Sequence, residues 1–272
     1  AGGMLAWLAE GLPAIQPEEF SPVQVERYAR HLVMPQVGLE GQRKLLDSRV
    51  LLAGLGGLNS PAAMYLAAAG VGTLGLLDDD RVERSNLQRQ VIHGESSLQS
   101  AKTESAANRL ADINPDARVV QLNERVTDRN AAGVVRGWDV VVDGTDNFPA
   151  RYALNEACVQ HEIPLVYGAV MRFQGQVSVF DPARGEQSPC FRCLMPEAPP
   201  EGATPSCSEA GVLGVMPGII GTLQAAEALK LLLGVGRALT GQLLLVDTLT
   251  MEFRRMRIPR NRECVTCSRR SE

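Results

Sequence analysis

Residues 50–59 read VLLAGLGGLN, an apolar run followed by a glycine-rich turn. A short apolar run that ends at glycine is typical of a buried strand. Gly54 permits a tight turn, and Gly56 lets backbone amides approach phosphate oxygens at the N-terminus of the next helix. Asn59 stands where a dinucleotide fingerprint has its third glycine, which weakens an interpretation as an NAD site. The stretch predicts a nucleotide-binding turn, and the alternative is a turn that serves only packing.

Strand and helix patterns alternate on both sides of this stretch. A helix is expected from Ser21-Pro22 to Leu32, because proline is favoured in a first helical turn. The strands expected in the first half are 49–53, 73–77, 118–122 and 138–142. The helices expected between them are 60–69, 102–113 and 150–161. This alternation predicts a parallel, doubly wound sheet. How tight the glycine-rich turn is depends on the effect of Asn59.

The order of elements changes from residue 163. Strands are expected at 165–170, 176–180, 243–246 and 252–257, with one helix at 217–233. Strands that follow one another closely indicate antiparallel pairing. We therefore predict an α/β fold, with a doubly wound Rossmann-like half and an appended, mainly antiparallel C-terminal part of the same sheet.

The length and composition suit one large domain. The chain has 272 residues, of which 45% are hydrophobic. We predict an N-terminal extension over residues 1–20 and a single domain over 21–272. Its nucleotide-binding half covers about residues 48–162, and its second half covers about 163–272.

Charge and hydropathy exclude several classes of partner. The net charge of −4 offers no polybasic surface for nucleic acid. The longest apolar region, 211–236, contains Gln224, Glu227 and Lys230, which argues against a membrane span. Residues 1–12 lack a basic segment, so no secretory signal is expected. Six cysteines, four of them in two CxxC pairs, then indicate metal ligands in a reducing cytoplasm.

Charged residues lie at or near the ends of the predicted strands. Asp78 and Asp146 each follow a strand, and ligands of open α/β sheets gather outside these carboxyl ends. A carboxylate at Asp78 can accept hydrogen bonds from ribose hydroxyls. Arg89 and Lys102 are suited to neutralising a polyphosphate. Taken singly, each of these residues also fits an ordinary solvated surface position.

Four cysteines form a candidate zinc site. Cys190, Cys193, Cys264 and Cys267 can provide tetrahedral S₄ coordination, which is typical of a structural site. Closing the chain between the pairs costs on the order of 4 kcal/mol. Structural zinc binding contributes roughly 10–16 kcal/mol, so the metal outweighs this cost. The alternatives are reduced core thiols or a redox-active CxxC pair.

Cys207 lies apart from these pairs, in the proline- and glycine-rich stretch 181–211. A cysteine in such a loop is either a nucleophile or an incidental residue, because its activation depends on neighbours that sequence does not show. His31, His93 and His161 form no metal-binding or triad spacing. The sequence therefore gives little support to a hydrolase or a zinc protease.

The chain resembles the MoeB/ThiF family of sulfur-carrier adenylyltransferases, bacterial relatives of ubiquitin-activating enzymes. The resemblance covers all but the first 20 residues. The matching motifs are RYARH at 27–31, GLGG at 54–57, SNLQRQ at 85–90, Lys102, DGTDN at 143–147, both CxxC pairs and SEAG at 208–211.

This resemblance implies ATP-dependent adenylylation of the C-terminal glycine carboxylate of a small ubiquitin-like sulfur carrier, with release of pyrophosphate. The carrier would be MoaD- or ThiS-like and would end in Gly-Gly. The reaction would activate it for sulfur transfer in molybdopterin, thiamine or related biosynthesis. The implied cofactors are ATP, Mg²⁺ and Zn²⁺. The implied enzyme is a cytoplasmic homodimer whose second half binds the carrier, with a cysteine desulfurase or rhodanese-type protein as sulfur donor.

The resemblance also implies the roles of individual residues. The nucleotide-binding set is Gly54, Gly56, Gly57, Asp78, Asn86, Gln88, Arg89, Lys102, Asp146 and Asn147. The catalytic set that the resemblance implies is Arg30, Arg89, Lys102 and Asp146. The loop position of Cys207 adds it as a candidate nucleophile, with an incidental cysteine as the alternative. Asp146 would organise Mg²⁺, and Arg30 would reach the ATP of the partner subunit.

Three other functions compete with this hypothesis. An NAD-dependent oxidoreductase would explain the glycine-rich turn but not Lys102, Arg89 and Asp146 together. A non-catalytic scaffold subunit would have no need of these charged residues. An enzyme that adenylylates a peptide or a modified tRNA base would keep them, although the acidic composition argues against tRNA.

Overall fold

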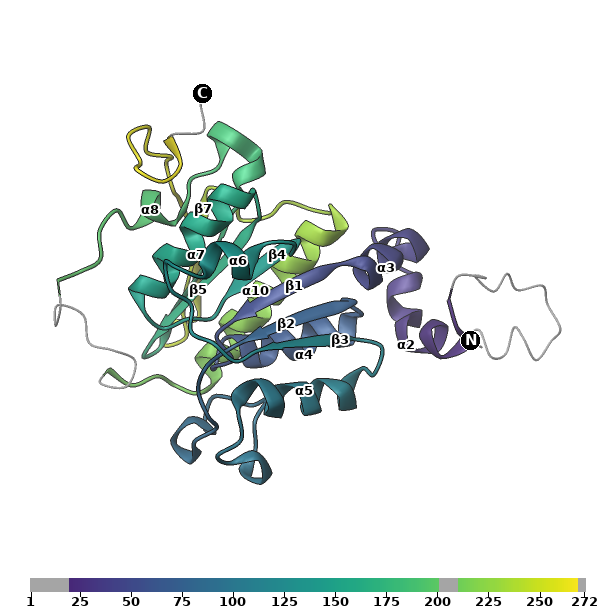
Figure 1. Cartoon of the computed structure of the whole chain (residues 1–272). Coiled ribbons are helices and arrows are strands. Elements are labelled where there is room, and N and C mark those ends of the chain that lie inside the picture. Colours follow the sequence, from purple (N-terminus) through teal and green to yellow (C-terminus); the bar gives the residue numbers. More distant parts are fainter. Residues whose placement is uncertain (1–19, 201–209, 269–272) are drawn as a thin grey trace. The chain divides into compact units, whose positions relative to one another are not determined.

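The computed structural model describes residues 20–200 and 210–268, which form two compact units (Figure 1). The first unit extends to Arg43 and holds helix α2 (Pro22–Leu32). The Ser21 hydroxyl caps α2 by accepting a hydrogen bond from the Gln24 amide, as the serine–proline start predicts. Helix α3 (Gly38–Asp47) was not predicted, because its glycines are typical of helix ends rather than helix interiors.

The second unit contains one sheet of eight strands in the order β3-β2-β1-β4-β5-β6-β7-β8. Its strands are β1 (Arg49–Ala53), β2 (Thr73–Leu77), β3 (Arg118–Leu122), β4 (Val140–Asp143), β5 (Leu165–Met171), β6 (Gln174–Phe180), β7 (Gln242–Asp247) and β8 (Glu252–Arg257). Strands β1 to β5 pair in parallel, and the pairs from β5 to β8 are antiparallel. The predicted fold class is confirmed, including the antiparallel part of the same sheet.

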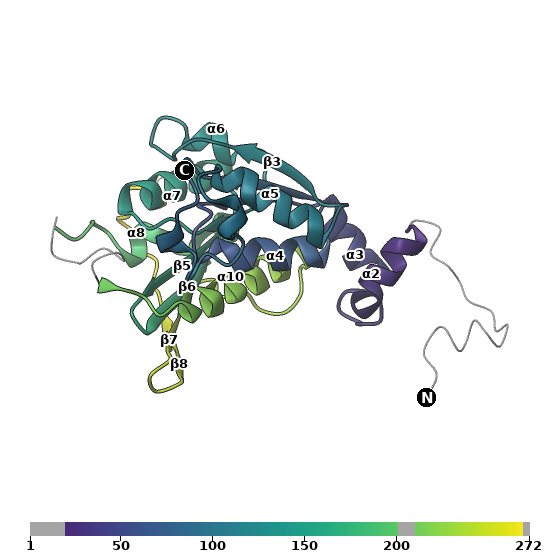
Figure 2. The same ribbon diagram turned by 90° about the horizontal axis from the view of Figure 1, so that it is seen from below.

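Helices cover both faces of the parallel part (Figure 2). One face carries α4 (Asn59–Ala69), α5 (Lys102–Ile113) and α10 (Val215–Leu233). The other carries α6 (Ala131–Val135), α7 (Phe148–His161) and the short α8 (Phe191–Leu194). Three 3₁₀ turns complete the described helices: η1 (Arg84–Asn86), η2 (Glu95–Ser97) and η3 (Pro182–Gln187).

In the central strand β1, apolar residues occupy successive positions instead of alternating with polar ones. Val50 and Leu52 are buried in the cluster that includes α4 and α10. Leu51 and Ala53 are buried in the cluster on the opposite face, with α6 and α7. Because successive side chains point to opposite faces, a strand between two layers of helices needs apolar residues at every position.

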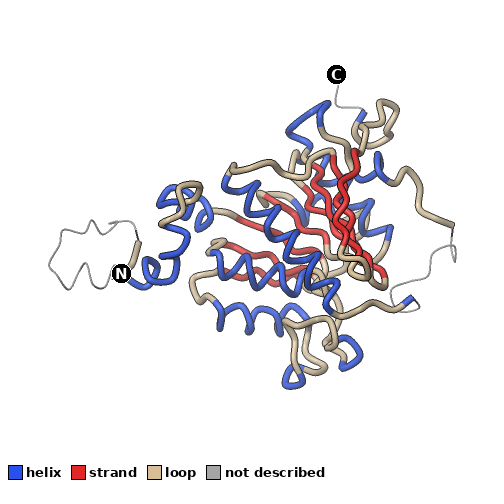
Figure 3. The backbone as a smooth tube through the Cα atoms, turned by 180° about the vertical axis from the view of Figure 1, so that it is seen from behind, coloured by secondary structure: helices blue, strands red, loops and turns tan. Residues whose placement is uncertain are grey.

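The helix α10 lies across the sheet near its middle (Figure 3). By length and composition alone it is apolar enough to cross a membrane. However, its Gln224 side chain is buried and donates to the carbonyls of Asp143 (2.8 Å) and Val166 (3.1 Å). Glu227, also buried, accepts from the Leu239 amide at 2.9 Å. These polar residues fix α10 to neighbouring backbone, so we interpret it as a core helix.

One strand begins later than predicted. The expected strand 138–142 is β4, which starts at Val140. The indole of Trp138 donates to the Val134 carbonyl at 2.9 Å, and its ring fills the space above Gly75. Trp138 therefore belongs to the turn after α6, where its apolar character reflects packing rather than strand pairing.

Candidate functional site

A pocket of about 480 Å³ lies at the carboxyl ends of the parallel strands. It is bounded by the turn after β1, the ends of β2, β4 and β5, and the first residues of α5 and α7. Eight predicted site residues line it: Gly54, Gly56, Gly57, Asp78, Arg89, Lys102, Asp146 and Asn147. The topology thus brings together residues that the sequence separates widely, as expected for a doubly wound sheet.

The glycine-rich turn fits closely between its neighbours. Gly54 has φ 80°, and a Cβ there would lie 3.0 Å from the Gly144 carbonyl oxygen. A Cβ at Gly57 would lie 2.9 Å from Pro217 Cβ, at the start of α10. Both glycines are therefore required by close approach, and Gly54 also by its left-handed backbone.

Asn59 holds this turn in place. It is fully buried, and its Nδ2 lies 2.7 Å from the Gly54 carbonyl, 3.0 Å from that of Ala53 and 3.2 Å from that of Val142. These acceptors belong to β1, β4 and the turn between β1 and α4. The third glycine of the fingerprint is therefore replaced by a side chain that ties two strand ends together.

The acidic and basic groups at the ends of β2 and α5 are paired. Lys102 is only 5% exposed, and its Nζ lies 2.8 Å from Asp80 Oδ2 and 3.8 Å from Asp78 Oδ1. Asp78 Oδ2 also accepts from the Leu55 amide at 2.6 Å. Asp78 is thus fixed against the glycine-rich turn, where it and Lys102 form the floor of the pocket.

The segment 85–90 contributes to the pocket differently from the prediction. Arg89 lines the pocket and donates to Asn86 Oδ1 at 3.0 Å, so Asn86 orients Arg89 from outside the pocket lining. Gln88 is exposed and does not line the pocket. Gln90 does line it, with a buried Oε1 that lacks a hydrogen-bond partner among the described residues. Spacing within a turn does not show which side chain faces inward, and in this structure it is Gln90 rather than Gln88 that faces the pocket.

The turn 143–147 places an exposed carboxylate beside a buried ion pair. Asp146 is exposed at the pocket, while the Asn147 side chain caps α7 by accepting from the Ala150 amide at 3.0 Å. Asp143 is buried, which raises the pKa of its carboxyl, although the Arg151 guanidinium 3.5 Å away opposes this effect. Arg151 also lines the pocket and was not predicted, because its partners Thr145, Gly168 and Asp143 become its neighbours only in the folded sheet.

His93 supports the glycine-rich turn from below. Its Nε2 lies 3.1 Å from the Leu55 carbonyl oxygen, and its Nδ1 lies 2.9 Å from Ser105 Oγ. Because a carbonyl can only accept, Nε2 carries a proton. Burial lowers the pKa of His93, the Leu55 carbonyl raises it, and the nearby charge of Lys102 lowers it further. The imidazole is therefore held neutral, as a structural group.

Two predicted catalytic residues are not brought to this pocket by the described second unit. Arg30 belongs to the first unit, where it is exposed on α2. Cys207 lies outside the described residues.

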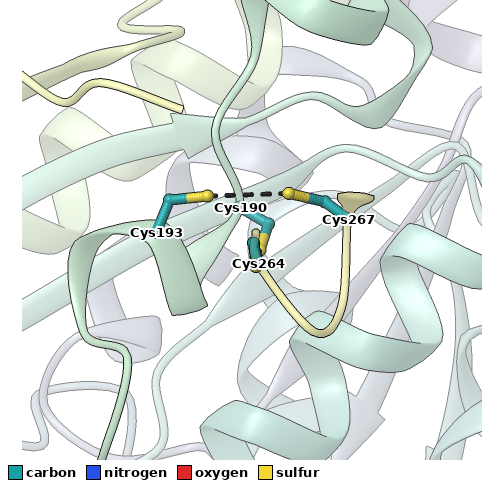
Figure 4. A group of neighbouring side chains, drawn as sticks. All are labelled: Cys190, Cys193, Cys264 and Cys267. Atoms are coloured by element: carbon teal, nitrogen blue, oxygen red, sulfur yellow. Dashed lines mark hydrogen bonds between the residues drawn. The ribbon is translucent and has the colours of Figure 1, made fainter. Parts of the chain in front are cut away.

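The four cysteines of the two CxxC pairs form one cluster (Figure 4). The Sγ atoms lie 3.6 Å apart for Cys190 and Cys264, and 3.5 Å apart for Cys193 and Cys267. All four sulfur atoms lie within 4.8 Å of one another. Tetrahedral zinc with bonds of about 2.3 Å requires sulfur separations of about 3.8 Å, so the cluster fits a Zn²⁺ ion.

The cysteines of this cluster share hydrogen bonds that act on them in opposite directions. The hydrogen bonds from Cys190 and Cys267 lower the pKa of Cys193, and the Asn261 amide, 3.4 Å from Cys193 Sγ, acts in the same direction. The same sharing raises the pKa of Cys190. None of the four cysteines lines the pocket at the strand ends. A metal held here would therefore join the C-terminal segment to α8 rather than take part in nucleotide chemistry.

The strand order, the glycine-rich turn and the charged pocket at the strand ends together define a Rossmann-like fold, with a cluster of four cysteines that could hold a metal ion. A model of the ThiF family matches residues 28–266, and the chain belongs to this family.

Two relatives are similar over almost their whole length. The SAMP-activating enzyme E1 of Haloferax volcanii is 50% identical over 244 residues, which cover 90% of this chain and 89% of the relative. The sulfur carrier protein adenylyltransferase of Thermus thermophilus is 48% identical over 246 residues, which cover 90% of this chain and 91% of the relative. The chain is therefore an enzyme of the nucleotidyltransferase kind.

A longer relative and several solved structures extend this comparison. The probable adenylyltransferase/sulfurtransferase MoeZ of Mycobacterium tuberculosis is 44% identical over 248 residues, which cover 90% of this chain but only 63% of the relative. The crystal structure of E. coli MccB with ATP has a TM-score of 0.77 at 21% identity, covering 89% of this chain and 74% of that one. The crystal structure of PaaA has a TM-score of 0.72 at 22% identity, covering 94% and 81%. These two likenesses show a shared fold.

Proposed function

We propose that this enzyme uses ATP to adenylylate the C-terminal glycine carboxylate of a ubiquitin-like sulfur carrier, with release of pyrophosphate. The observation that carries the proposal is the pocket at the strand ends, where Lys102, Arg89 and Asp146 surround a phosphate-binding turn. The name of the Thermus thermophilus relative supports a sulfur carrier as the substrate.

The nucleotide would lie along the glycine-rich turn. Gly54, Gly56 and Gly57 would let backbone amides approach the phosphates. Asp78 would accept hydrogen bonds from the ribose, since its carboxylate is already oriented by the Leu55 amide. Lys102 would then leave part of its pairing with Asp80 to contact the α-phosphate, because the whole polyphosphate chain carries more negative charge than one carboxylate.

The residues at the pocket also fit a magnesium ion. Mg²⁺ prefers carboxylate and carbonyl oxygens together with substrate phosphates. Asp146 offers an exposed carboxylate at the pocket, and the carboxylates of Asp78, Asp79 and Asp80 lie within 4.8 Å of one another. When bound, Mg²⁺ would neutralise phosphate charge. Asp146 would hold it, and Arg89, oriented by Asn86, would contact the phosphate chain.

The proposed reaction needs no general base. A terminal carboxylate is ionised at neutral pH and can attack the α-phosphate directly. The demand on the protein is therefore to neutralise charge and to align the two reactants. This explains why the one histidine beside the turn, His93, is buried and neutral rather than placed at the pocket.

We extend the proposal to assembly and sulfur transfer. Arg30, exposed on α2, would reach the ATP of a partner subunit in a homodimer. Cys207 would accept sulfur from a cysteine desulfurase or a rhodanese-type donor, and the product would serve molybdopterin, thiamine or related biosynthesis. A need for ATP and for reduced thiols would be met in the cytoplasm.

The first experiment is ATP–pyrophosphate exchange with purified enzyme, Mg²⁺ and carriers that end in Gly-Gly. Exchange is expected only with carrier present, and the Lys102→Ala variant is expected to lose on the order of 10²- to 10³-fold in rate. Lys230→Ala is the matched control and should keep full activity. It changes a lysine near the end of α10, beside the amino ends of the central strands. Two outcomes would argue for a different carboxylate substrate or a scaffold role. One is exchange in the absence of carrier, and the other is no exchange with any carrier although the enzyme binds ATP.

A further inference from the structure

The pocket cation Arg151 has no part in the roles described so far. Arg151 lies in the first turn of α7, and its side chain is 12% exposed. Its Nη2 donates to the carbonyls of Thr145 (2.8 Å) and Gly168 (3.2 Å), and its Nε lies 3.5 Å from Asp143 Oδ2. These contacts fix the guanidinium in one orientation.

The same contacts leave part of the guanidinium available. No hydrogen bond joins Nη1 to any residue that the structure describes. The Tyr167 ring lies 5.2 Å from Cζ and supports the guanidinium plane, while Arg151 itself lines the pocket. A fixed cation with an unused N–H pair at a pocket is suited to binding an anion.

The position of Arg151 separates it from the phosphate-binding cations. Lys102 begins α5 and pairs with the acidic residues that follow β2, Asp78 and Asp80. Arg151 instead lies against β5, where it donates to the Gly168 carbonyl, and Val170 of this strand and Val212 beside its end line the pocket. This side offers apolar walls and one cation, a combination that suits an unbranched peptide tail with a terminal carboxylate.

We propose that Arg151 binds the terminal carboxylate of the carrier and holds it against the α-phosphate of ATP. This inference rests on the proposed function. One carboxylate oxygen would accept from Nη1, and the other would form the new bond to the α-phosphorus. The bond from that phosphorus to the bridging oxygen breaks at the same centre, and pyrophosphate leaves with the electron pair. No proton moves, and Asp143 keeps Arg151 in position from behind.

The test separates recognition of the carboxylate from support of the fold. Two carriers would be prepared, identical except that one ends in a carboxylate and the other in a carboxamide. Their affinities would be measured with Mg²⁺ and a non-cleavable α,β-methylene analogue of ATP. Wild-type enzyme should prefer the carboxylate by on the order of tenfold to a hundredfold. Arg151→Gln should bind both carriers about equally, at the level of the carboxamide.

A purely structural role gives a different result. Damage to the fold would weaken the binding of both carriers and leave the ratio of their two affinities at the wild-type value. A wild-type ratio in Arg151→Gln would therefore overturn the proposal. Arg151→Lys keeps the charge without the planar fork and should retain an intermediate preference. Arg125→Gln, at an exposed arginine of the same pocket that pairs with Asp79, is the matched control and should keep the full preference.

The ATP–pyrophosphate exchange assay distinguishes the two levels of failure. If wild-type enzyme exchanges with a carrier but binds the carboxylate and carboxamide forms equally, the role of Arg151 is wrong while the proposed function stands. If no carrier supports exchange, the proposed function fails, and the assignment of Arg151 fails with it.

Discussion

At the scale of single residues, buried polar side chains set the shape of the pocket. Asn59 donates to backbone carbonyls of two strand ends, and His93 supports the Leu55 carbonyl. Both residues are buried and neither faces a substrate, yet each fixes a part of the glycine-rich turn. The turn therefore owes its position to side chains whose role the sequence did not reveal.

The protonation of His93 predicts how stability depends on pH. Burial lowers its pKa in the folded enzyme, so the unfolded chain takes up a proton first as the pH falls below the ordinary value of 6.5. The stability that neutral His93 contributes is thus present above about pH 6.5 and is lost as the pH falls toward its lowered pKa. One such proton changes the free energy of unfolding by at most about 1.4 kcal/mol per pH unit.

We expect the His93→Gln variant to lose less stability than wild-type enzyme between about pH 7 and about pH 5, because it lacks this titrating group. Urea denaturation of both proteins at the two pH values measures the difference. Equal losses in the two proteins would show that His93 does not govern the acid response.

Residue roles divide into those with a local signal and those without one. Gly54, Asp78 and Lys102 line the pocket as predicted, because position at a strand end or a helix start is enough to place them. Gln88 and Gln90 lie two positions apart in an irregular turn, where no periodicity tells the exposed from the buried side chain. Arg151 had no local signal, because its partners Thr145 and Gly168 become its neighbours only in the folded sheet.

At the scale of elements, α10 and the turn before α4 pack closely enough to exclude a methyl group. A Cβ at Gly221 would lie 1.9 Å from the Leu58 carbonyl oxygen, whereas a Cβ at Gly218, in the same helix, would meet nothing within 4 Å. The two glycines therefore make a matched pair within one element.

We expect Gly221→Ala to lower the free energy of unfolding by about 3 kcal/mol, because α10 must move away from Leu58. The same shift would displace the nucleotide turn and weaken ATP binding. Gly218→Ala should instead raise the free energy of unfolding by up to about 1 kcal/mol, through helix propensity. Urea denaturation and ATP titration measure both effects, and similar stabilities for the two variants would contradict the close packing.

Most elements were predicted correctly because their patterns are local. The strands β1, β2 and β3 and the helix α5 have the predicted bounds, since apolar runs and capping signals mark them clearly. The helix α3 was not predicted, and it holds two glycines, Gly38 and Gly41, which are poor helix formers. The start of β4 was misplaced because the apolar Trp138 packs on Gly75 instead of pairing with β1.

At the scale of the whole molecule, the cysteine cluster joins distant parts of the chain. Cys190 caps the start of α8 and Cys193 lies within it, while Cys264 and Cys267 lie close to the C-terminal end of the described residues. A zinc ion here would fix the C-terminal segment to the rest of the second unit. Like a cross-link, it would reduce the conformational freedom of the chain while it remains bound.

Purified enzyme is expected to contain about one zinc per chain. Cys264→Ser should lose the zinc and lower the midpoint of thermal unfolding by roughly 10 °C, because one of four ligands is removed. Cys158→Ala changes a buried cysteine outside the cluster and should keep the zinc. Elemental analysis and thermal unfolding provide the measurements, and iron or no metal in wild-type enzyme would overturn the assignment.

The sequence by itself determined the fold class, the glycine-rich turn, the charged residues at the strand ends and the four cysteines. These features depend on neighbours along the chain, or on spacings that few other structures share. Only the tertiary structure decided that Asn59 joins two strand ends, that Gln90 rather than Gln88 faces the pocket, and that Arg151 is fixed by Asp143, Thr145 and Gly168. The physical reason is that these roles depend on contacts between strands that are distant in sequence, and such contacts form only when the sheet is assembled.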